Sequence, residues 1–215
     1  LADVGAETPE GWASDVTRTW PVSGRFTRGQ RELYQAVLEA QRVAIDAVAP
    51  GVRYRDIHRM AARRLLDGLV QMGLLRGDPD QLLAQGAAAL FFPHGVGHLI
   101  GLDVHDMEDL GDRAGYAPGR ERSSAPGERW LRLDRDLEPG MAVTIEPGFY
   151  QIEALLRDGS LGPLETALDR RRLQALDVRG IRIEDDVLVT ESGREVLTAK
   201  IPKLPDAVEA AMQGL

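Results

Sequence analysis

The stretch FFPHGVGHLIGLDVHD, residues 91–106, holds three of the four histidines in this chain of 215 residues. His94 and His98 have the spacing of the paired histidines on a zinc-protease helix, but the glutamate that such a motif needs beside its first histidine is absent. Pro93 and the surrounding glycines disfavour a helix. We therefore expect His94, His98 and His105 to lie on a turn and a strand. They are metal ligands, acid–base groups or ordinary core residues, and any partners come from elsewhere in the chain.

Composition excludes several classes of protein. Hydrophobic residues make up 43% of the chain and charged residues 28%, which is typical of a globular protein rather than a disordered or membrane one. The formal net charge of −8 and the lack of a basic run disfavour a nucleic-acid partner. The most apolar region, residues 82–102, is broken by proline, glycine and histidine, so we expect no membrane span. The absence of cysteine excludes disulfides, thiolate catalysis and zinc–thiolate sites, and it suits a cytoplasmic protein.

The first half of the chain predicts two strands followed by three helices. Residues 1–21 have the pattern of two short strands around a polar turn. The sequence TRGQ, residues 27–30, has the spacing of a helix-capping box, and the apolar stripe after it predicts a helix to about Ala49. A second amphipathic helix is expected over residues 55–72, and a third, shorter one over residues 78–86.

The second half of the chain predicts two central strands. GMAVTIEPGFY (residues 140–150) and GIRIEDDVLVT (residues 180–190) carry the strongest strand patterns. Between them, the charged residues 153–179 contain leucines whose spacing allows a surface helix. Residues 111–128, rich in Gly, Pro, Arg and Ser, predict a long loop.

Each of these two strands carries a glutamate opposite its apolar face. Alternation places Glu146 on the same face as Thr144, and Glu184 on the same face as Arg182. A glutamate in a strand usually faces solvent. On the second face of a central strand, however, a carboxylate is buried and needs a cation. Pro147 and Gly148, directly after Glu146, predict that the strand ends there and fixes the side chain of Glu146 at its rim.

Two aspartates near the N-terminus pose a similar question. Asp15 lies in the middle of a strand pattern, where aspartate is disfavoured by propensity, and shares a face with Thr17. Asp3 and Asp15, each taken alone, are explained as turn formers. Taken together with the glutamates and one histidine, they form an oxygen-dominated set without a thiol, which suits a pair of divalent cations. Two such cations can lower the pKa of a water between them. A two-metal hydrolase is therefore one open interpretation.

Four ordered motifs extend over nearly the whole chain: LADVGAE…SDVTRTWPV, HGVGHLIGLDVHD, LEPGMAVTIEPGFY and GIRIEDDVLVT. They resemble the blocks of the pita-bread metallopeptidases, which include prolidase (Xaa-Pro dipeptidase), aminopeptidase P and methionine aminopeptidase. The resemblance implies the α+β pita-bread (creatinase/aminopeptidase) fold, a curved, antiparallel-rich sheet with flanking helices. It also implies that residues 1–215 are the C-terminal part of a single catalytic domain. The first part of that domain and an N-terminal domain are expected in a preceding segment of the same polypeptide, which this half needs.

The same resemblance implies two divalent metal ions, manganese in most of the family, with cobalt or zinc as substitutes. By position, the metal ligands would be Asp3, Asp15, His98, Glu146 and Glu184. Asp15 and Glu184 would bridge the two ions, Asp3 would complete one, and His98 with Glu146 the other. Glu146 would also carry a proton from the bridging water toward the leaving amine.

The resemblance assigns the remaining site residues to the substrate. His94 and His105 match histidines that bind the substrate and stabilise the tetrahedral intermediate, so the implied catalytic residues are Glu146, His105 and His94. Arg182 matches an arginine of the proline-specific branches. Arg132 occupies the place where prolidases bind the free C-terminal carboxylate of the dipeptide, a task that the planar guanidinium suits.

Among the branches, the resemblance favours a prolidase. SDVTRTWPVSGRFT looks like the proline-specific type rather than a methionine aminopeptidase. The long segments on either side of Glu146 resemble bacterial prolidases, including ERWLRLDRDLEPG before the glutamate strand. The implied activity is metal-dependent hydrolysis of the Xaa-Pro bond in dipeptides by a hydroxide that bridges the two metals.

Two other functions remain as alternatives. Aminopeptidase P, which releases the N-terminal residue from longer Xaa-Pro peptides, is the first, because GLDVHDMEDLGD is also similar to bacterial aminopeptidase P-like enzymes. The second is a non-enzymatic binding protein on the same fold, which is disfavoured because all five ligand positions hold the correct residue types. A homodimer is expected from the resemblance.

Overall fold

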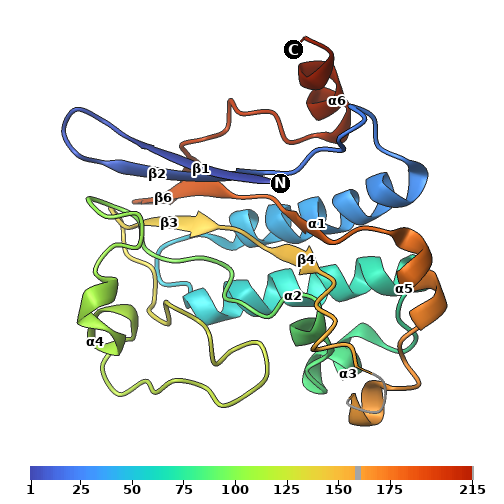
Figure 1. Ribbon diagram of the computed structural model, residues 1–215. Helices are drawn as coiled ribbons and strands as arrows, with labels where there is room; N and C mark the ends of the chain where they lie inside the picture. Colours follow the sequence, from blue (N-terminus) through green and yellow to red (C-terminus); the bar gives the residue numbers. More distant parts are fainter. Residues whose placement is uncertain (158–160, 215) are drawn as a thin grey trace.

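The computed structural model describes residues 1–157 and 161–214. A curved set of short antiparallel strands lies against two long helices, and the loops of the middle third of the chain close one end of this two-layer arrangement (Figure 1). In chain order the elements are β1 (Ala2–Glu7), β2 (Ala13–Arg18), α1 (Arg28–Ala47), α2 (Tyr54–Gln71), α3 (Pro79–Ala84), η1 (Ala87–Leu90), η2 (Glu108–Leu110), α4 (Asp112–Gly115), β3 (Ala142–Ile145), β4 (Gly148–Tyr150), η3 (Gly162–Leu164), α5 (Arg170–Leu176), β5 (Gly180–Arg182), β6 (Asp185–Thr190), β7 (Gly193–Val196) and α6 (Pro205–Gln213).

Helices α1 and α2 form the layer that supports the strands. The predicted capping box is confirmed at the start of α1, where the Gln30 N–H donates to Thr27 Oγ1 at 3.3 Å and the Thr27 N–H donates to the Gln30 side chain at 3.0 Å. The two helices approach closely at Gly68, because a Cβ at that position would lie 2.5 Å from the Cβ of Ala36. Their buried faces form one hydrophobic core with the strands. None of the helices within the described residues is long and apolar enough to span a membrane.

Both predicted central strands are present, but each is interrupted at its glutamate. β3 and β4 are separated by Glu146 and Pro147, and β5 and β6 by Ile183 and Glu184. β3 pairs antiparallel with β6, and β4 with β5. The break expected from Pro147 and Gly148 is confirmed, since Pro147 offers no N–H to a ladder. The second strand was expected to be continuous, and this was wrong, because Ile183 and Glu184 separate β5 from β6. The backbone N–H of each glutamate pairs with another segment.

The backbone hydrogen bonds of the two glutamates connect the strands to the histidine stretch and to the β1–β2 hairpin. The Glu146 N–H donates to Val96 O at 2.7 Å, and the Glu184 N–H donates to Thr17 O at 3.1 Å. The first bond ties the histidine stretch to β3, and the second ties the β1–β2 hairpin to the start of β6. Figure 1 shows the hairpin lying beside β6, on the side away from β3.

The histidine stretch runs along β3 and forms no helix, as expected from its glycines and proline. The expected strand is not formed: the stretch contributes only a bridge between Leu99 and Val143, beside which the Thr144 N–H donates to His98 O at 3.0 Å. Gly97 passes so close to β3 that a Cβ would lie 2.1 Å from Thr144 O and 2.4 Å from the Tyr54 hydroxyl. A glycine is therefore required at this position.

The expectations for residues 111–128 and 153–179 are confirmed only in part. Residues 111–128 are not a loop throughout, because α4 forms one short helical turn at their start. Within residues 153–179, helical structure is confined to η3 and α5, and residues 158–160 lie outside the described residues. The strands over residues 1–21 and the three helices of the first half are confirmed, with ends that differ by a few residues.

The close approach at Gly97 generates a test. We expect Gly97→Ala to lower the free energy of unfolding by about 1–3 kcal/mol, because the added Cβ overlaps Thr144 O and must push β3 away. Gly193→Ala is the matched control, since a Cβ there meets nothing within 4 Å. Urea denaturation of the full-length protein measures both. Equal losses for the two variants would contradict the close approach.

Candidate metal centre

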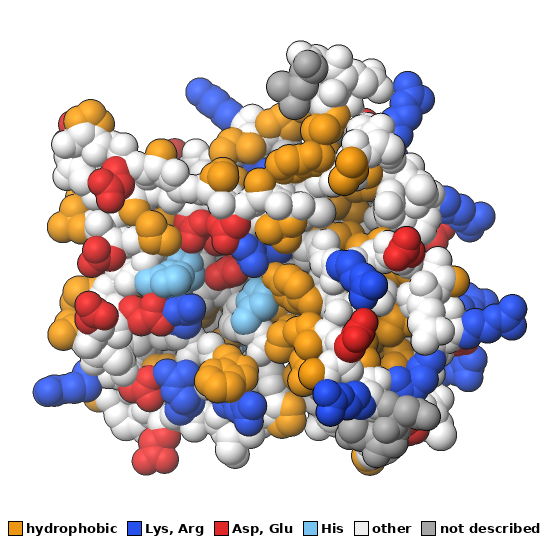
Figure 2. Space-filling view, viewed as in Figure 1, with side chains coloured by type: hydrophobic (Ala, Val, Ile, Leu, Met, Phe, Trp, Pro, Cys, Tyr) orange, Lys and Arg blue, Asp and Glu red, His pale blue; other side chains and the backbone are white. Residues whose placement is uncertain are grey.

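The five predicted metal ligands come from four separate segments and line one cavity of ≈ 650 Å³. Figure 2 shows acidic side chains and histidines gathered in a hollow on the face beneath the β1–β2 hairpin. The other predicted site residues, His94, His105, Arg132 and Arg182, line the same cavity. All of the candidate site residues are thus brought together.

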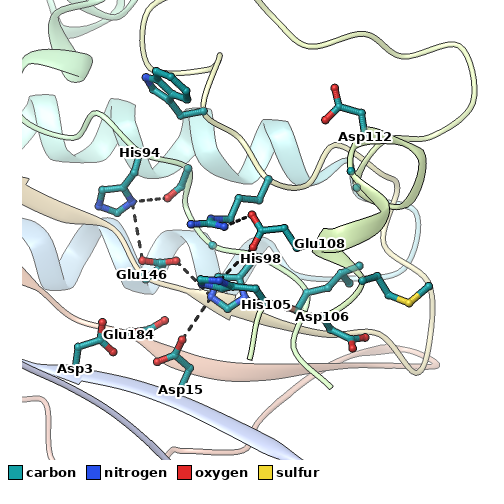
Figure 3. A pocket seen from close by; sticks show the side chains of 18 of the residues that line it. Asp3, Asp15, His94, His98, His105, Asp106, Glu108, Asp112, Glu146 and Glu184 are labelled. Carbon is teal, nitrogen blue, oxygen red and sulfur yellow. Dashed lines mark hydrogen bonds and ion pairs between the residues drawn. The ribbon is translucent and has the colours of Figure 1, made fainter. Parts of the chain in front are cut away.

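The carboxylates and His98 form two overlapping groups (Figure 3). Asp3, Asp15 and Glu184 each offer an oxygen within 4.8 Å of the others, and so do the ligand atoms of His98, Glu146 and Glu184. Glu184 belongs to both groups. Two adjacent triads that share a carboxylate have the form of a dinuclear cation site.

The hairpin fixes the first group through backbone pairing. β1 and β2 are antiparallel, with Asp3 opposite Thr17. The Asp15 N–H donates to Asp186 Oδ2 at 3.1 Å, which anchors β2 to β6 beside the site. Thr17 Oγ1 donates to Glu184 Oε2 at 2.6 Å and thereby orients the shared carboxylate.

Electrostatics indicate that the carboxylates need a cation. Burial raises the pKa of Glu146 to about 8, and repulsion by Glu184 contributes to the shift. Burial likewise raises the pKa of Glu184 to about 8. Burial also raises the pKa of Asp3, whereas at Asp15 the effect of burial is outweighed by hydrogen bonds with His98 and Asp3, so its pKa is lowered. Without added positive charge, the group cannot hold all its carboxylates ionised at neutral pH.

His98 is oriented so that one ring nitrogen faces the carboxylates. Its Nδ1 lies 2.9 Å from Leu99 O and can donate to it, which leaves Nε2 with the lone pair. Nε2 lies 3.5 Å from Asp15 Oδ2 and 3.8 Å from Glu146 Oε1. The His98 N–H in turn donates to Thr144 Oγ1 at 3.1 Å, which fixes the backbone of the residue.

His94 lies on the other side of Glu146. Its Nδ1 is 2.7 Å from Gly95 O and 3.9 Å from Glu146 Oε2, and its Nε2 is 3.0 Å from the Tyr150 hydroxyl. Burial lowers the pKa of His94 to about 4, so its ring is neutral at pH 7. The Tyr150 hydroxyl also accepts from Arg182 Nη1 at 3.3 Å.

Arg182 connects the two groups of carboxylates. Its Nε donates to Thr17 Oγ1 at 2.9 Å, its guanidinium contacts Asp3, and Nε lies 3.9 Å from Glu146 Oε2. The prediction that Arg182 and Glu184 lie on the same face is confirmed, because both line the cavity.

His105 and Arg132 form the outer part of the cavity wall. The rings of His105 and His98 lie 4.4 Å apart between centroids, and His105 forms a third possible ligand group with Asp15 and His98. Of the three histidines, only His98 was expected to bind metal, and the structure brings His105 within reach as well. Arg132 forms an ion pair with Glu108.

Four further residues at the site were not singled out from the sequence: Thr17, Thr144, Tyr150 and Glu108. The two threonines could have been found from the sequence. In a strand, alternate residues share a face, so Thr17 lies on the face of Asp15 and Thr144 on the face of Glu146. Tyr150 and Glu108 had no comparable signal, since one follows the break at Glu146 and the other lies in a segment without periodicity.

The sequence and structural relatives are consistent with this site. Residues 1–191 match the profile of metallopeptidase family M24. Human Xaa-Pro dipeptidase is 43% identical over 216 residues, which cover 100% of this chain and 42% of that protein. Escherichia coli Xaa-Pro aminopeptidase is 39% identical over 212 residues, which cover 99% of this chain and 40% of that protein. The chain thus spans less than half the length of these curated relatives.

Solved structures of aminopeptidase P superpose on the chain. A variant of the Escherichia coli enzyme gives a TM-score of 0.75 at 37% identity and covers 99% of this chain and 40% of that one. The Pseudomonas aeruginosa aminopeptidase PepP gives 0.73 at 38% identity, with 95% and 39% covered. The zinc-substituted Escherichia coli enzyme in complex with product gives 0.70 at 36% identity, with the same coverage. The predicted pita-bread fold is confirmed, and the chain forms part of it. The chain belongs to metallopeptidase family M24.

Proposed function

We propose that the protein is a metal-dependent Xaa-Pro dipeptidase. The observation that carries this proposal is the pair of ligand groups that share Glu184 inside one cavity. The relatives named Xaa-Pro dipeptidase and Xaa-Pro aminopeptidase support the same bond specificity, and each is a longer protein of which this chain matches a part.

We propose that two divalent cations bind these groups, with manganese as the metal and cobalt or zinc as substitutes. Asp3, Asp15 and Glu184 would hold one, and His98, Glu146 and Glu184 the other, with Asp15 as the second bridge. The donor set fits, because carboxylates with one imidazole suit such ions and the raised pKa values of Glu146 and Glu184 leave a demand for positive charge. When bound, the cations would supply hydroxide near neutral pH by lowering the pKa of a water between them.

The two oxygens of Glu146 face different partners. Oε1 lies toward His98, at 3.8 Å from Nε2, whereas Oε2 lies toward His94 and Arg182, each at 3.9 Å. One oxygen can therefore serve as a ligand while the other accepts a proton and passes it to the leaving amine. His94 and His105 would bind the substrate carbonyl as neutral rings, because burial lowers the pKa of both.

We propose that Arg132 binds the C-terminal carboxylate of a dipeptide and thereby limits substrate length. It lines the same cavity as the metal ligands, and its side chain is 44% exposed, so a substrate can reach it. Aminopeptidase P activity is the alternative, and the structural similarity to aminopeptidase P enzymes favours keeping it.

The site also supports a proposal about the rest of the polypeptide. Among the described residues β1 pairs only with β2, and residues 3–7 of β1 are exposed. We propose that a preceding segment covers this strand and completes the catalytic domain. The homodimer and the cytoplasmic location stay predictions from the resemblance and the composition.

Substrate length distinguishes the two enzymatic functions. We expect the full-length, manganese-loaded protein to cleave an Xaa-Pro dipeptide faster than an Xaa-Pro-Yaa tripeptide. Arg132→Ala should raise KM for the dipeptide about tenfold or more, because a charge-assisted pair contributes roughly 1.5–3 kcal/mol. Arg129→Ala, at an exposed position three residues away, is the control. Preferred cleavage of the tripeptide, with no effect of Arg132→Ala, would favour aminopeptidase P.

The shared carboxylate should control metal content. We expect Glu184→Gln to lower the manganese content of the purified protein and to reduce kcat by at least about a hundredfold, since removing one ligand disturbs both cation positions. Elemental analysis and peptide hydrolysis measure the two effects. Glu153→Gln is the control, because Glu153 forms an ion pair with Arg179 at 3.4 Å outside the cavity lining. Full metal content in Glu184→Gln would contradict the assignment.

The raised pKa values predict how metal binding depends on pH. Without metal, the folded protein holds protons on Glu146 and Glu184 up to pH about 8, whereas the unfolded chain releases them near 4.5. The metal-free protein therefore loses stability as pH rises from about 4.5 to 8.

Binding of manganese to Glu146 and Glu184 would require these protons to leave, so its affinity should increase between pH 6 and pH 8. Thermal unfolding with chelator and with manganese at both pH values measures this. We expect a larger rise in Tm on adding manganese at pH 8. An equal or larger rise at pH 6 would show that the carboxylates are already ionised in the metal-free protein.

A further inference from the structure

Glu108 contacts two residues that the proposed function assigns to the substrate. Its Oε1 accepts from Arg132 Nη1, and its Oε2 lies 3.1 Å from His105 Nδ1. Figure 3 shows Glu108 beside His105, with its carboxylate directed into the cavity. All three residues line the cavity that holds the candidate metal ligands. The carboxylate of Glu108 thus contacts Arg132, the residue to which the proposed function assigns the C-terminal carboxylate of the peptide.

The contact between Glu108 and Arg132 is of a kind that a ligand can replace. It involves a single nitrogen of the guanidinium, and both side chains are 44% exposed. Among residues 1–157 and 161–214, Arg132 forms no other side-chain hydrogen bond or ion pair. Exposed ion pairs of this type contribute little to stability, so exchanging one carboxylate for another on Arg132 costs little.

Glu108 lies on an exposed turn that lines the cavity. Met107, with φ of 59°, is one of two described non-glycine residues with positive φ, and Gly111 at the other end of η2 has φ of 62°. A non-glycine residue at positive φ is uncommon, and here it directly precedes the cavity-lining carboxylate. Residues 107–113 are exposed, so no core packing is lost if Glu108 moves.

We propose that Glu108 occupies, in the free protein, the position of the substrate's C-terminal carboxylate on Arg132, and that the substrate displaces it. This inference rests on the assignment of Arg132 under the proposed function. Glu108 keeps its second contact with His105 during the exchange. A ligand without a carboxylate gains nothing from Arg132, because it cannot replace Glu108. Glu108 therefore sharpens selection for a free C-terminus, and it returns to Arg132 when the proline product leaves.

The test compares ligands that differ only in the carboxylate. N-acetyl-L-proline and N-acetyl-L-prolinamide are titrated calorimetrically into the full-length, manganese-loaded protein. We expect Glu108→Gln to bind N-acetyl-L-proline about tenfold more tightly than the wild type, or about 1.4 kcal/mol, because the competing charge is gone. Its affinity for the amide should not change. With Arg132→Ala already present, Glu108→Gln should have no effect.

Asp109→Asn is the matched control, because Asp109 lies in the same exposed turn, carries the same charge and does not line the cavity. An equal gain in Asp109→Asn would overturn the proposal in favour of a general charge effect. Unchanged or weaker binding of N-acetyl-L-proline by Glu108→Gln would overturn it directly, as would failure of every variant to bind this ligand. Failure of the proposed function would give a different result: the wild-type protein would cleave neither dipeptides nor tripeptides with proline in the second position.

Discussion

The repulsion among buried carboxylates is the constraint on which the rest of this structure depends. Asp15 and Glu184 are buried, and Glu146 and Asp3 lie within reach of them. Such a set is costly in a protein interior unless positive charge or protons balance it. Arg182 and His98 supply part of that balance, and the raised pKa values of the two glutamates show that it is incomplete. The surrounding fold can be understood as the means of holding these acids together despite their repulsion.

Backbone hydrogen bonds at the two glutamates help to hold the acids together. The Glu146 N–H donates to Val96 O, one pleat beyond the bond from the Thr144 N–H of β3 to His98 O. The Glu184 N–H donates to Thr17 O. The bonds of the two glutamates therefore join the histidine stretch and the N-terminal hairpin to the sheet. The acids that repel one another lie at the points where the segments are joined.

Much of the fold could be predicted from the sequence, and the site in part. Capping at Thr27 and the amphipathic helices follow from local chemistry, which needs no knowledge of the tertiary structure. The break after Glu146 follows from Pro147, whereas the break at Glu184 could not be predicted, because the alternation of side chains continues across it. Burial of Asp185 and Asp186 was equally hidden, since it depends on distant partners: Asp185 binds Arg18 and Lys203, and Asp186 accepts from the backbone of Asp15. Glu108 could not be found because its partners are distant in sequence and its segment has no pattern.

Asp3 lies on β1, the outermost and most exposed strand, whereas His98, Glu146 and Glu184 belong to the packed body of the protein. The two halves of the candidate centre thus require different amounts of the fold to be in place. One half is complete once β3, β6 and the histidine stretch have assembled, and the other exists only while the hairpin is docked. If the proposed pair of cations binds here, release of β1 alone would remove Asp3 from one cation position without disturbing the core, so the occupancy of that position would report on how firmly β1 is held.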